Sequence, residues 1–153
     1  VYLITYLFMN LGAFLIVIEI YNRTGSFDLK DYRGLYRRSP FLTIAMTVFM
    51  LSLMGIPPFA GFFGKLYVFG AAVNTNLAWF AVVGALNSVV AVYYYARVIK
   101  TMILEANEDT SRLCLPWSSH LMIWFLLLPT VGMMLFWGLI QQLAVTSTKL
   151  FPG

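Results

Sequence analysis

Lys65 is the residue of this sequence best able to do chemistry inside a membrane. It lies in an apolar segment that runs from Pro40 to beyond Gly70 without another charged side chain. Keeping an ammonium group in hydrocarbon costs several kcal/mol, about 3 kcal/mol on the insertion scale, so such a lysine rarely persists without a task. Burial disfavours the charged form of a lysine, which allows it to release a proton near neutral pH. We therefore predict that Lys65 acts as a proton relay.

Four residues on the N-terminal side of Lys65 interrupt helical structure. Pro57 and Pro58 lack the amide hydrogen of a helix, and each ring clashes with the carbonyl group four residues earlier. Gly55 and Gly61 supply flexible corners on either side of the two prolines. Backbone groups freed by such a break coordinate ions in membrane transporters, where they line a cavity or are buried in protein. The break and the lysine together predict part of an ion path.

The apolar segment is too long for one straight membrane helix. Residues 41–73 would form about 50 Å of helix, whereas the hydrocarbon core is about 30 Å thick. We expect a helix over residues 41–54, a non-helical linker near residues 55–60 and a half-helix over residues 61–73. Lys65 then follows the positive N-terminal end of the second half-helix, which adds to the cost of its charge.

Lys65 also has a purely structural interpretation. It lies about 12 Å from the end of the helix at Val73, so its ammonium group reaches the membrane surface only if the side chain is strained. A phosphate-binding loop is excluded, because Phe59 replaces a required glycine and Leu66 replaces the Ser or Thr that binds magnesium. The sequence therefore indicates no nucleotide site, and we expect no nucleic-acid partner.

The composition is that of an integral membrane protein. Of the 153 residues, 61% are hydrophobic and 10% are charged, and the mean hydropathy is +0.82. A membrane helix needs about 20 apolar residues. Four stretches meet this length, at residues 1–21, 41–73, 77–104 and 120–145. We predict an all-α, polytopic bundle of four transmembrane helices in a single membrane domain over residues 1–153, with the second helix broken at Gly55–Gly61.

The basic residues lie almost entirely on one side of these helices. Of the ten Lys and Arg residues, eight lie in or beside the first and third connections: Arg23, Lys30, Arg33, Arg37, Arg38, Arg97, Lys100 and Arg112. The connection at Asn74 has no charge, and only Lys149 follows the fourth helix. The positive-inside rule therefore places loops 22–39 and 105–119 on the cytoplasmic side, or its organellar equivalent.

Three further side chains are candidates for the proton path. Tyr93 and Arg97 lie toward the cytoplasmic end of the third helix, where an aromatic belt with snorkelling basic residues is the alternative interpretation. His120 opens the fourth helix, and an ordinary interfacial residue is the alternative there. Because Cys114 and His120 are the only cysteine and histidine, the chain by itself cannot form a haem ligand pair, an iron–sulfur cluster or a zinc site. We expect no metal and no cofactor in this chain.

The sequence begins at Val1, inside an apolar stretch rather than at a methionine. It has neither the basic start nor the small-residue cleavage site of a secretory signal. We expect Val1 to lie well inside a longer membrane protein, and a short processed subunit is the alternative.

Four segments of the chain together resemble one known family closely. They are Tyr6–Phe14, Asp31–Tyr36, Met50–Tyr67 and Tyr93–Lys100. The third of them joins the break to the lysine in one block, Met-Gly-Ile-Pro-Pro-Phe-Ala-Gly-Phe-Phe-Gly-Lys-Leu-Tyr. The family is subunit N of the proton-pumping NADH:quinone oxidoreductase, respiratory complex I, which is an antiporter-like membrane subunit. The resemblance covers residues 2–104, and the rest of the chain fits by hydropathy alone.

The resemblance implies a fold of fourteen helices, of which this chain supplies the eleventh to the fourteenth as the C-terminal part. It implies that Lys65 is the lysine of the broken twelfth helix, in a non-redox subunit that translocates protons while quinone is reduced elsewhere in the complex. The implied partners are the remainder of its own chain, other membrane subunits including sister antiporter-like subunits, and lipids. Flavin and iron–sulfur clusters are then expected in partner subunits.

Other functions stay open at the level of the sequence. A related subunit of a multi-subunit cation/proton antiporter or of a membrane-bound hydrogenase shares the broken helix and the lysine. A non-transporting scaffold would explain the apolar helices but neither Lys65 nor the two prolines. The bacterial cytoplasmic membrane is the favoured location, with the mitochondrial inner membrane and the thylakoid as alternatives.

Overall fold

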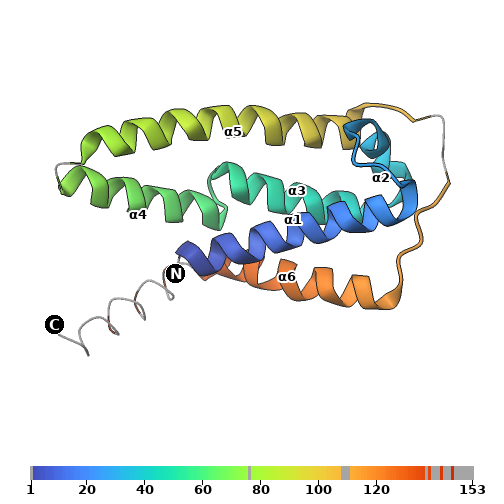
Figure 1. Ribbon diagram of the computed structural model, residues 1–153. Helices are drawn as coiled ribbons and strands as arrows, with labels where there is room; N and C mark the ends of the chain where they lie inside the picture. Colours follow the sequence, from blue (N-terminus) through green and yellow to red (C-terminus); the bar gives the residue numbers. More distant parts are fainter. Residues whose placement is uncertain are drawn as a thin grey trace.

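The computed structural model describes residues 2–75, 77–107, 111–136, 138, 142 and 146. Within these residues the chain is helical and contains no strand, which confirms the all-α prediction. Its described elements, in chain order, are α1 Tyr2–Thr24, the 3-10 helix η1 Leu29–Tyr32, α2 Leu35–Arg38, α3 Pro40–Met54, α4 Ala60–Asn74, α5 Ala78–Leu104 and α6 Trp117–Leu135 (Figure 1).

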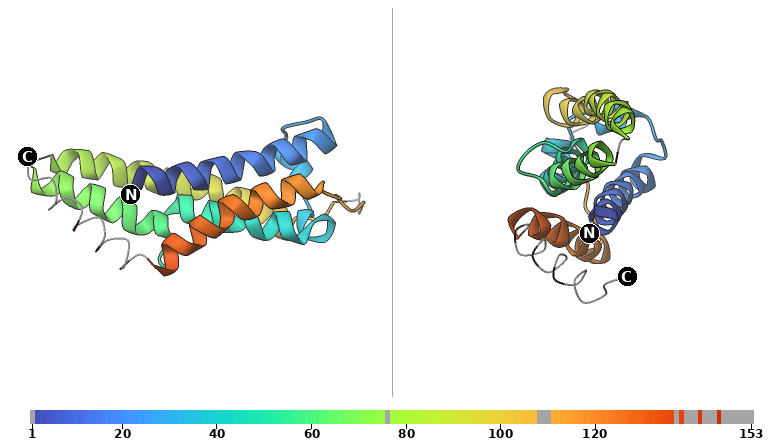
Figure 2. Two further views of the ribbon diagram at one scale, coloured as in Figure 1. Left: turned by 90° about the horizontal axis from the view of Figure 1, so that it is seen from below. Right: turned by 90° about the vertical axis from the view of Figure 1, so that its left-hand side faces the viewer.

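Helices α3 and α4 have α5 on one side and the pair α1 and α6 on the other. Helix α5 runs alongside both α3 and α4, while α1 and α6 pack against each other (Figure 1). In the end-on view of Figure 2, α3 and α4 lie between α5 and the α1–α6 pair. By length and composition, two of the described helices can cross a membrane, at Leu3–Thr24 and Ala78–Leu104. Shorter apolar helices cover Pro40–Met54 and Trp117–Met133.

Helices α3 and α4 are separate and lie end to end beside the single long helix α5 (Figure 1). Helix α3 starts at Pro40, because the fixed φ and the missing amide of proline suit the first helical position. It ends where Gly55 adopts a left-handed conformation, with a φ of 75°. Residues 55–59 are not helical, and α4 starts at Ala60. The interpretation of α3 and α4 as two halves of one membrane crossing stays a prediction.

The core lies where α1, α3 and α6 meet. Ile16, Phe49 and Ile123 have exposed fractions of 0% there. Gly12 on α1 leaves the space that the Phe49 ring of α3 occupies, because a Cβ atom at this glycine would overlap the ring. Small residues allow this close approach between membrane helices, where dispersion contacts supply much of the stability. The packing fixes the position of α3 against α1.

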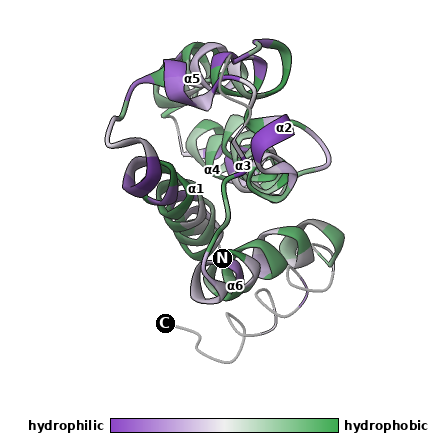
Figure 3. Cartoon of the chain, turned by 90° about the vertical axis from the view of Figure 1, so that its right-hand side faces the viewer, coloured by the Kyte–Doolittle hydropathy of each residue, from purple (hydrophilic) through white to green (hydrophobic). Residues whose placement is uncertain are grey.

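The connection between α1 and α3 has more structure than the sequence indicated. The sequence predicted a loop over residues 22–39, whereas the structure contains η1 and α2 in this segment. The reason is tertiary, because Tyr32 and Leu35 are buried in the core and draw the segment onto the helices. Polar residues gather at this end of the molecule, around α2 and the adjoining ends of α1 and α5 (Figure 3).

The fourth predicted helix starts earlier than the sequence indicated. The prediction was residues 120–145, whereas α6 starts at Trp117 and its described part ends at Leu135. Pro116 takes the N-cap position with an extended backbone, so the helix begins directly after it. Most of the residues predicted to continue this helix, from residue 137 onward, lie outside the described part of the chain.

Candidate functional site

Lys65 extends from the first half of α4 back to the end of α3. Its Nζ atom donates to the carbonyl oxygens of Leu53 at 3.1 Å and Met54 at 3.0 Å. In a continuous helix these carbonyls would accept hydrogen bonds from the amides four residues later, at the positions of Pro57 and Pro58. Proline has no amide hydrogen, so both carbonyls are left for the lysine. The two prolines thus create the acceptor pair to which Lys65 binds.

The C-terminal end of α3 stabilises the charge of Lys65. The last carbonyl groups of a helix carry the negative end of its dipole, which favours a nearby cation. Sequence reasoning identified only the unfavourable positive end of the second half-helix, and the structure adds this favourable end of the first. Among the described residues no acidic side chain forms an ion pair with Lys65, so its described partners are neutral carbonyl groups.

Gly61 lets α4 begin directly against the last turn of α3. A Cβ atom at Gly61 would overlap the carbonyl oxygen of Ser52. Ser52 is fully buried, and its carbonyl accepts a hydrogen bond from the amide of Gly55 at 3.1 Å. Its hydroxyl group has no hydrogen-bond partner in the described part of the chain. The close approach at Gly61 keeps Lys65 within reach of the free carbonyls.

A cavity of about 250 Å³ lies beside Lys65, between α1, α3, α4 and α5. Its lining combines polar and apolar residues: Tyr6, Leu53, Lys65, Val68, Phe69, Gly84, Asn87, Ser88, Ala91 and Tyr95. Water occupies about 30 Å³ per molecule in the liquid, so the cavity has room for several molecules with polar partners. The arrangement can therefore pass a proton between the lysine amine and water.

Sequence reasoning missed Tyr6, Ser88 and Tyr95 as neighbours of the lysine. On α5 the lining residues Gly84, Ser88, Ala91 and Tyr95 recur at intervals of three or four, so they share one face of the helix. This spacing was the signal that could have found Ser88 and Tyr95. Nothing in the sequence alone indicates that Tyr6, on a different helix, lines the same cavity.

The structure places Tyr93 and Arg97 away from this cavity. Tyr93 is 64% exposed, and its ring packs edge-on against Tyr94. Arg97 is exposed about one turn further along α5. Neither residue lines the cavity beside Lys65, and their part in a proton path stays a prediction.

His120 is also separate from the cavity. Its ring stacks on that of Phe41 with centroids 5.0 Å apart, and its Nδ1 atom lies 3.2 Å from the carbonyl oxygen of Pro116. The described residues contain no group of three or more His, Cys, Asp or Glu side chains that could hold a metal ion. The site beside Lys65 therefore offers hydrogen-bonding groups and room for water. The expected absence of a cofactor stays a prediction.

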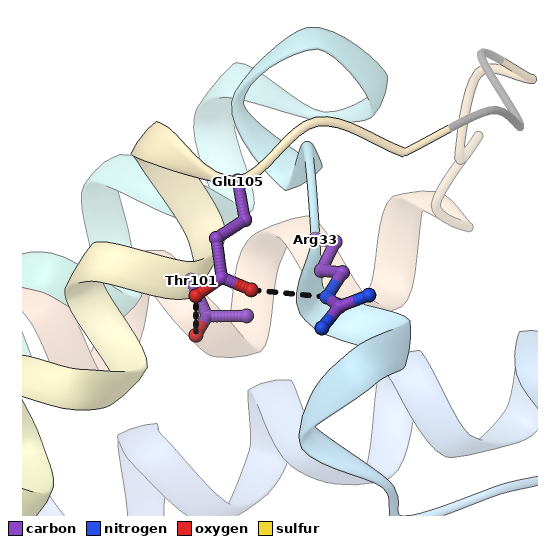
Figure 4. A network of polar contacts seen from close by, with 3 residues as sticks. All are labelled: Arg33, Thr101 and Glu105. Carbon is purple, nitrogen blue, oxygen red and sulfur yellow. Dashed lines mark hydrogen bonds and ion pairs between the residues drawn. The ribbon is translucent and has the colours of Figure 1, made fainter.

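A second polar region joins the α1–α3 connection to the end of α5. Arg33 Nε donates to Oε2 of Glu105 at 3.0 Å, and the Thr101 hydroxyl donates to Oε1 at 3.3 Å (Figure 4). The side chains of Arg33 and Glu105 are 46% and 33% exposed, so water screens this ion pair. The contact holds η1 and its flanking residues beside α5.

Arg38, in contrast, is buried within the same connection, with 7% of its surface exposed. Its Nε donates to the carbonyl of Ser111 at 3.3 Å and its Nη1 to that of Asp31 at 3.4 Å. Its own carbonyl accepts the amide of Leu113 at 3.1 Å. Arg38 thus links the α1–α3 connection to the α5–α6 connection at this end of the molecule.

Tyr32 lies in the same α1–α3 connection. Burial, and to a smaller extent the Asp31 carboxylate, raises the pKa of its phenol.

The sequence matches one family profile and several curated proteins. The sequence profile of the family described as NADH:quinone oxidoreductase/Mrp antiporter, TM, matches residues 1–91. The chain is 51% identical over 110 residues to NAD(P)H-quinone oxidoreductase subunit 2 of Acaryochloris marina, covering 72% of this chain and 21% of that protein. It is 50% identical over 112 residues to the chloroplastic subunit 2 of Chaetosphaeridium globosum, covering 72% and 22%. The chain spans about a fifth of the length of the curated relatives it matches.

A solved structure supports the same relationship. The fold is similar to that of a chain in respiratory complex I from Thermus thermophilus with bound aureothin, with a TM-score of 0.64 and 32% sequence identity. The similarity covers 73% of this chain and 26% of that chain.

Proposed function

The chain belongs to the family of NADH:quinone oxidoreductase and Mrp antiporter membrane subunits, and we propose that it is a proton-translocating part of a complex I subunit. The observation that carries this proposal is the bonding of Lys65 to the carbonyls of Leu53 and Met54 beside a partly polar cavity. A lysine held by neutral acceptors can lose its proton without leaving a buried carboxylate unpaired. Neutral partners therefore favour a proton relay, whereas a carboxylate partner would favour a structural ion pair.

In the proposed mechanism, the ammonium group of Lys65 is held by the two carbonyls at the end of α3. Proton transfer to water in the cavity leaves a neutral amine, which these carbonyls bind more weakly than a cation. Reprotonation restores the charged form and its two hydrogen bonds. The energy that drives this cycle comes from quinone reduction elsewhere in the complex, and the residues of this chain take part in no redox step.

The finer identity is also part of the proposal. The chain corresponds to the C-terminal part of subunit N, and the remainder of its own longer chain supplies the other helices. α1, the α3–α4 pair, α5 and α6 then form four crossings, of which the second is broken at Gly55–Gly61. This agrees with the small share of each curated relative that the chain spans.

The surroundings of the chain follow from this identity. Sister antiporter-like subunits, other membrane subunits and lipids cover the large apolar side chains that are exposed along α1, α4 and α5. Flavin and iron–sulfur clusters belong to other subunits of the complex. The bacterial cytoplasmic membrane is the favoured location, beside the mitochondrial inner membrane and, because one relative is chloroplastic, the thylakoid.

A cation/proton antiporter subunit is the second candidate, because the matching family includes Mrp antiporters by its own description. The relatives named here favour the quinone oxidoreductase, since both are subunits of that enzyme. Purification of the complex in mild detergent separates the two candidates. Co-purifying flavin and iron–sulfur subunits support the oxidoreductase, and a complex without redox centres supports the antiporter.

The orientation of the chain is proposed from its charge asymmetry. The α1–α3 connection and the α5–α6 connection face the cytoplasm or its equivalent, and the turn at Thr75 faces the opposite side. In the complex, a single cysteine at Ser26 should react with an impermeant maleimide only from the cytoplasmic side, and one at Thr75 only from the other side. Labelling of the Thr75 position from the cytoplasm would refute this orientation.

The test of function is Lys65→Ala in the complete complex. The substitution removes the titrating group and introduces no new charge, so the complex should still assemble. Redox-coupled proton pumping, measured in sealed vesicles, should fall about tenfold if the lysine lies on an obligatory path, and electron transfer should fall with it if the two are tightly coupled. A complex that assembles and keeps both its full rate of pumping and its full proton-to-electron ratio would show that Lys65 has a structural role.

Two further variants separate charge from proton exchange. Lys65→Arg keeps the positive charge but cannot release it near neutral pH, so pumping should also be impaired. Lys65→Glu introduces a group that titrates near neutrality when buried, so partial pumping should be retained. Full pumping in the arginine variant would mean that a fixed charge at this position is sufficient.

A further inference from the structure

Gly55 differs from Gly61 on the other side of the break, because it lies against the side chain of Lys65. It takes the left-handed position at the end of α3, with a φ of 75°. A Cβ atom built on Gly55 would lie 3.0 Å from Cδ, 3.4 Å from Cε and 3.4 Å from Nζ of Lys65. The lysine stem therefore passes directly over the face of Gly55 on its way to the carbonyls.

Two physical reasons could explain a glycine at this position. One is the positive φ, which most other residues adopt only with strain. The other is the space that the lysine stem occupies. Gly25 at the end of α1 separates these reasons, because its φ is 71° but a Cβ atom there would meet nothing within 4 Å. The two glycines share the backbone conformation and differ in the contact.

We infer that Gly55 is a positioning residue for Lys65: its missing side chain leaves the space through which the lysine reaches the carbonyls of Leu53 and Met54. This inference rests on the proposed function, because positioning matters for transport only if Lys65 relays protons. The prolines provide the acceptors, and Gly55 provides access to them. A methyl group at this position requires the stem to shift by a few tenths of an ångström, even where the helix end is unchanged.

The displaced side chain has an open direction in which to move. Lys65 lines the cavity that also contains Asn87 and Ser88, so its flexible stem can turn away from Gly55 into that space. We expect the ammonium group then to move from its position on the two carbonyls and to bind them less well. The effect of Gly55→Ala should therefore depend on the presence of Lys65.

The experiment is a double-mutant cycle in the complete complex, with Gly55→Ala, Lys65→Ala and the double variant beside the natural protein. Two quantities are measured: the proton-to-electron ratio in sealed vesicles and the temperature at which the purified complex dissociates. Gly55→Ala alone should lower the proton-to-electron ratio by at least about threefold. It should also lower the dissociation temperature relative to the natural protein. In the Lys65→Ala background the same glycine substitution should change the dissociation temperature much less, because the steric contact is gone.

Gly25→Ala is the matched control for the backbone strain. It should lower the dissociation temperature slightly and leave the proton-to-electron ratio unchanged. The inference is overturned if Gly55→Ala behaves like Gly25→Ala, or if it lowers the dissociation temperature equally with and without Lys65. If Gly55→Ala prevents assembly, restored assembly in the double variant supports the inference and failure of both overturns it. Normal pumping by Lys65→Ala would refute the proposed function alone, since the dissociation temperatures still test the contact.

Discussion

The α1–α3 connection and the break between α3 and α4 hold their basic residues in different ways. In the connection, Arg33 forms an ion pair with Glu105, and Arg38 is buried with hydrogen bonds to two backbone carbonyls. At the break, Lys65 also binds two carbonyls, but it lines a cavity with room for water. Arg33 forms its ion pair at the surface and Arg38 is buried in the connection, whereas Lys65 lies beside a cavity into which its side chain and its proton can move.

The difference shows how residue type and surroundings act together. An arginine keeps its charge at all physiological pH values, and its planar group binds several acceptors at once, which suits a structural link between connections. A lysine can release its proton when it is partly removed from water. We therefore expect substitutions at the break to affect transport and substitutions in the connection to affect stability.

The largest effect should come from restoring the amides at the break. Pro57→Ala together with Pro58→Ala provides N–H donors for the carbonyls that Lys65 now binds, and alanine is the best helix former. The helix should continue through the break, and the proton-to-electron ratio should fall by about tenfold. Assembly, measured on native gels, should fall much less. Pro40→Ala at the start of α3 is the control, because it frees or blocks no carbonyl at the break.

A smaller effect, on stability alone, should follow from Arg38→Ala. The substitution removes the charged donor of two part-buried hydrogen bonds, to the carbonyls of Asp31 and Ser111, at a cost of about 1–3 kcal/mol. The purified complex should dissociate at a lower temperature. Its proton-to-electron ratio per assembled complex should equal that of the natural protein. A reduced ratio in the assembled variant would mean that the connection also takes part in transport.

The smallest effect should come from Arg33→Ala, which removes an exposed ion pair. Exposed pairs contribute up to about 1 kcal/mol and are screened by salt. The dissociation temperature should fall slightly at low ionic strength and less at high ionic strength, with pumping unchanged. Glu105→Gln should give a similar, salt-dependent change, because it removes the negative charge of the same ion pair. A large loss of pumping in either variant would contradict this expectation and would show that the connection matters for transport as much as the break does.

Much of the break could be predicted from the sequence, because its causes are local. Pro57 and Pro58 lack amide hydrogens wherever they occur, so the end of helical structure before them follows from covalent chemistry. The position of Lys65 within a long apolar segment could also be predicted, because it too is a local property of the sequence. The helical parts of the connection over residues 22–39 could not be predicted, because η1 and α2 depend on burial of Tyr32 and Leu35 against distant helices.

What only the tertiary structure decided is which groups meet Lys65. The lysine bonds to carbonyls more than ten positions earlier in the chain and shares a cavity with Tyr6 on α1 and Ser88 on α5. The path of its stem over Gly55 is likewise a contact between α4 and the residue that ends α3. Such contacts depend on how separate helices pack, which hydrophobic content and local breakers do not specify. The sequence by itself determined that a charged group lies near helix-breaking residues in the apolar segment of a membrane protein, and the packing of α1, α3, α4 and α5 decided its partners.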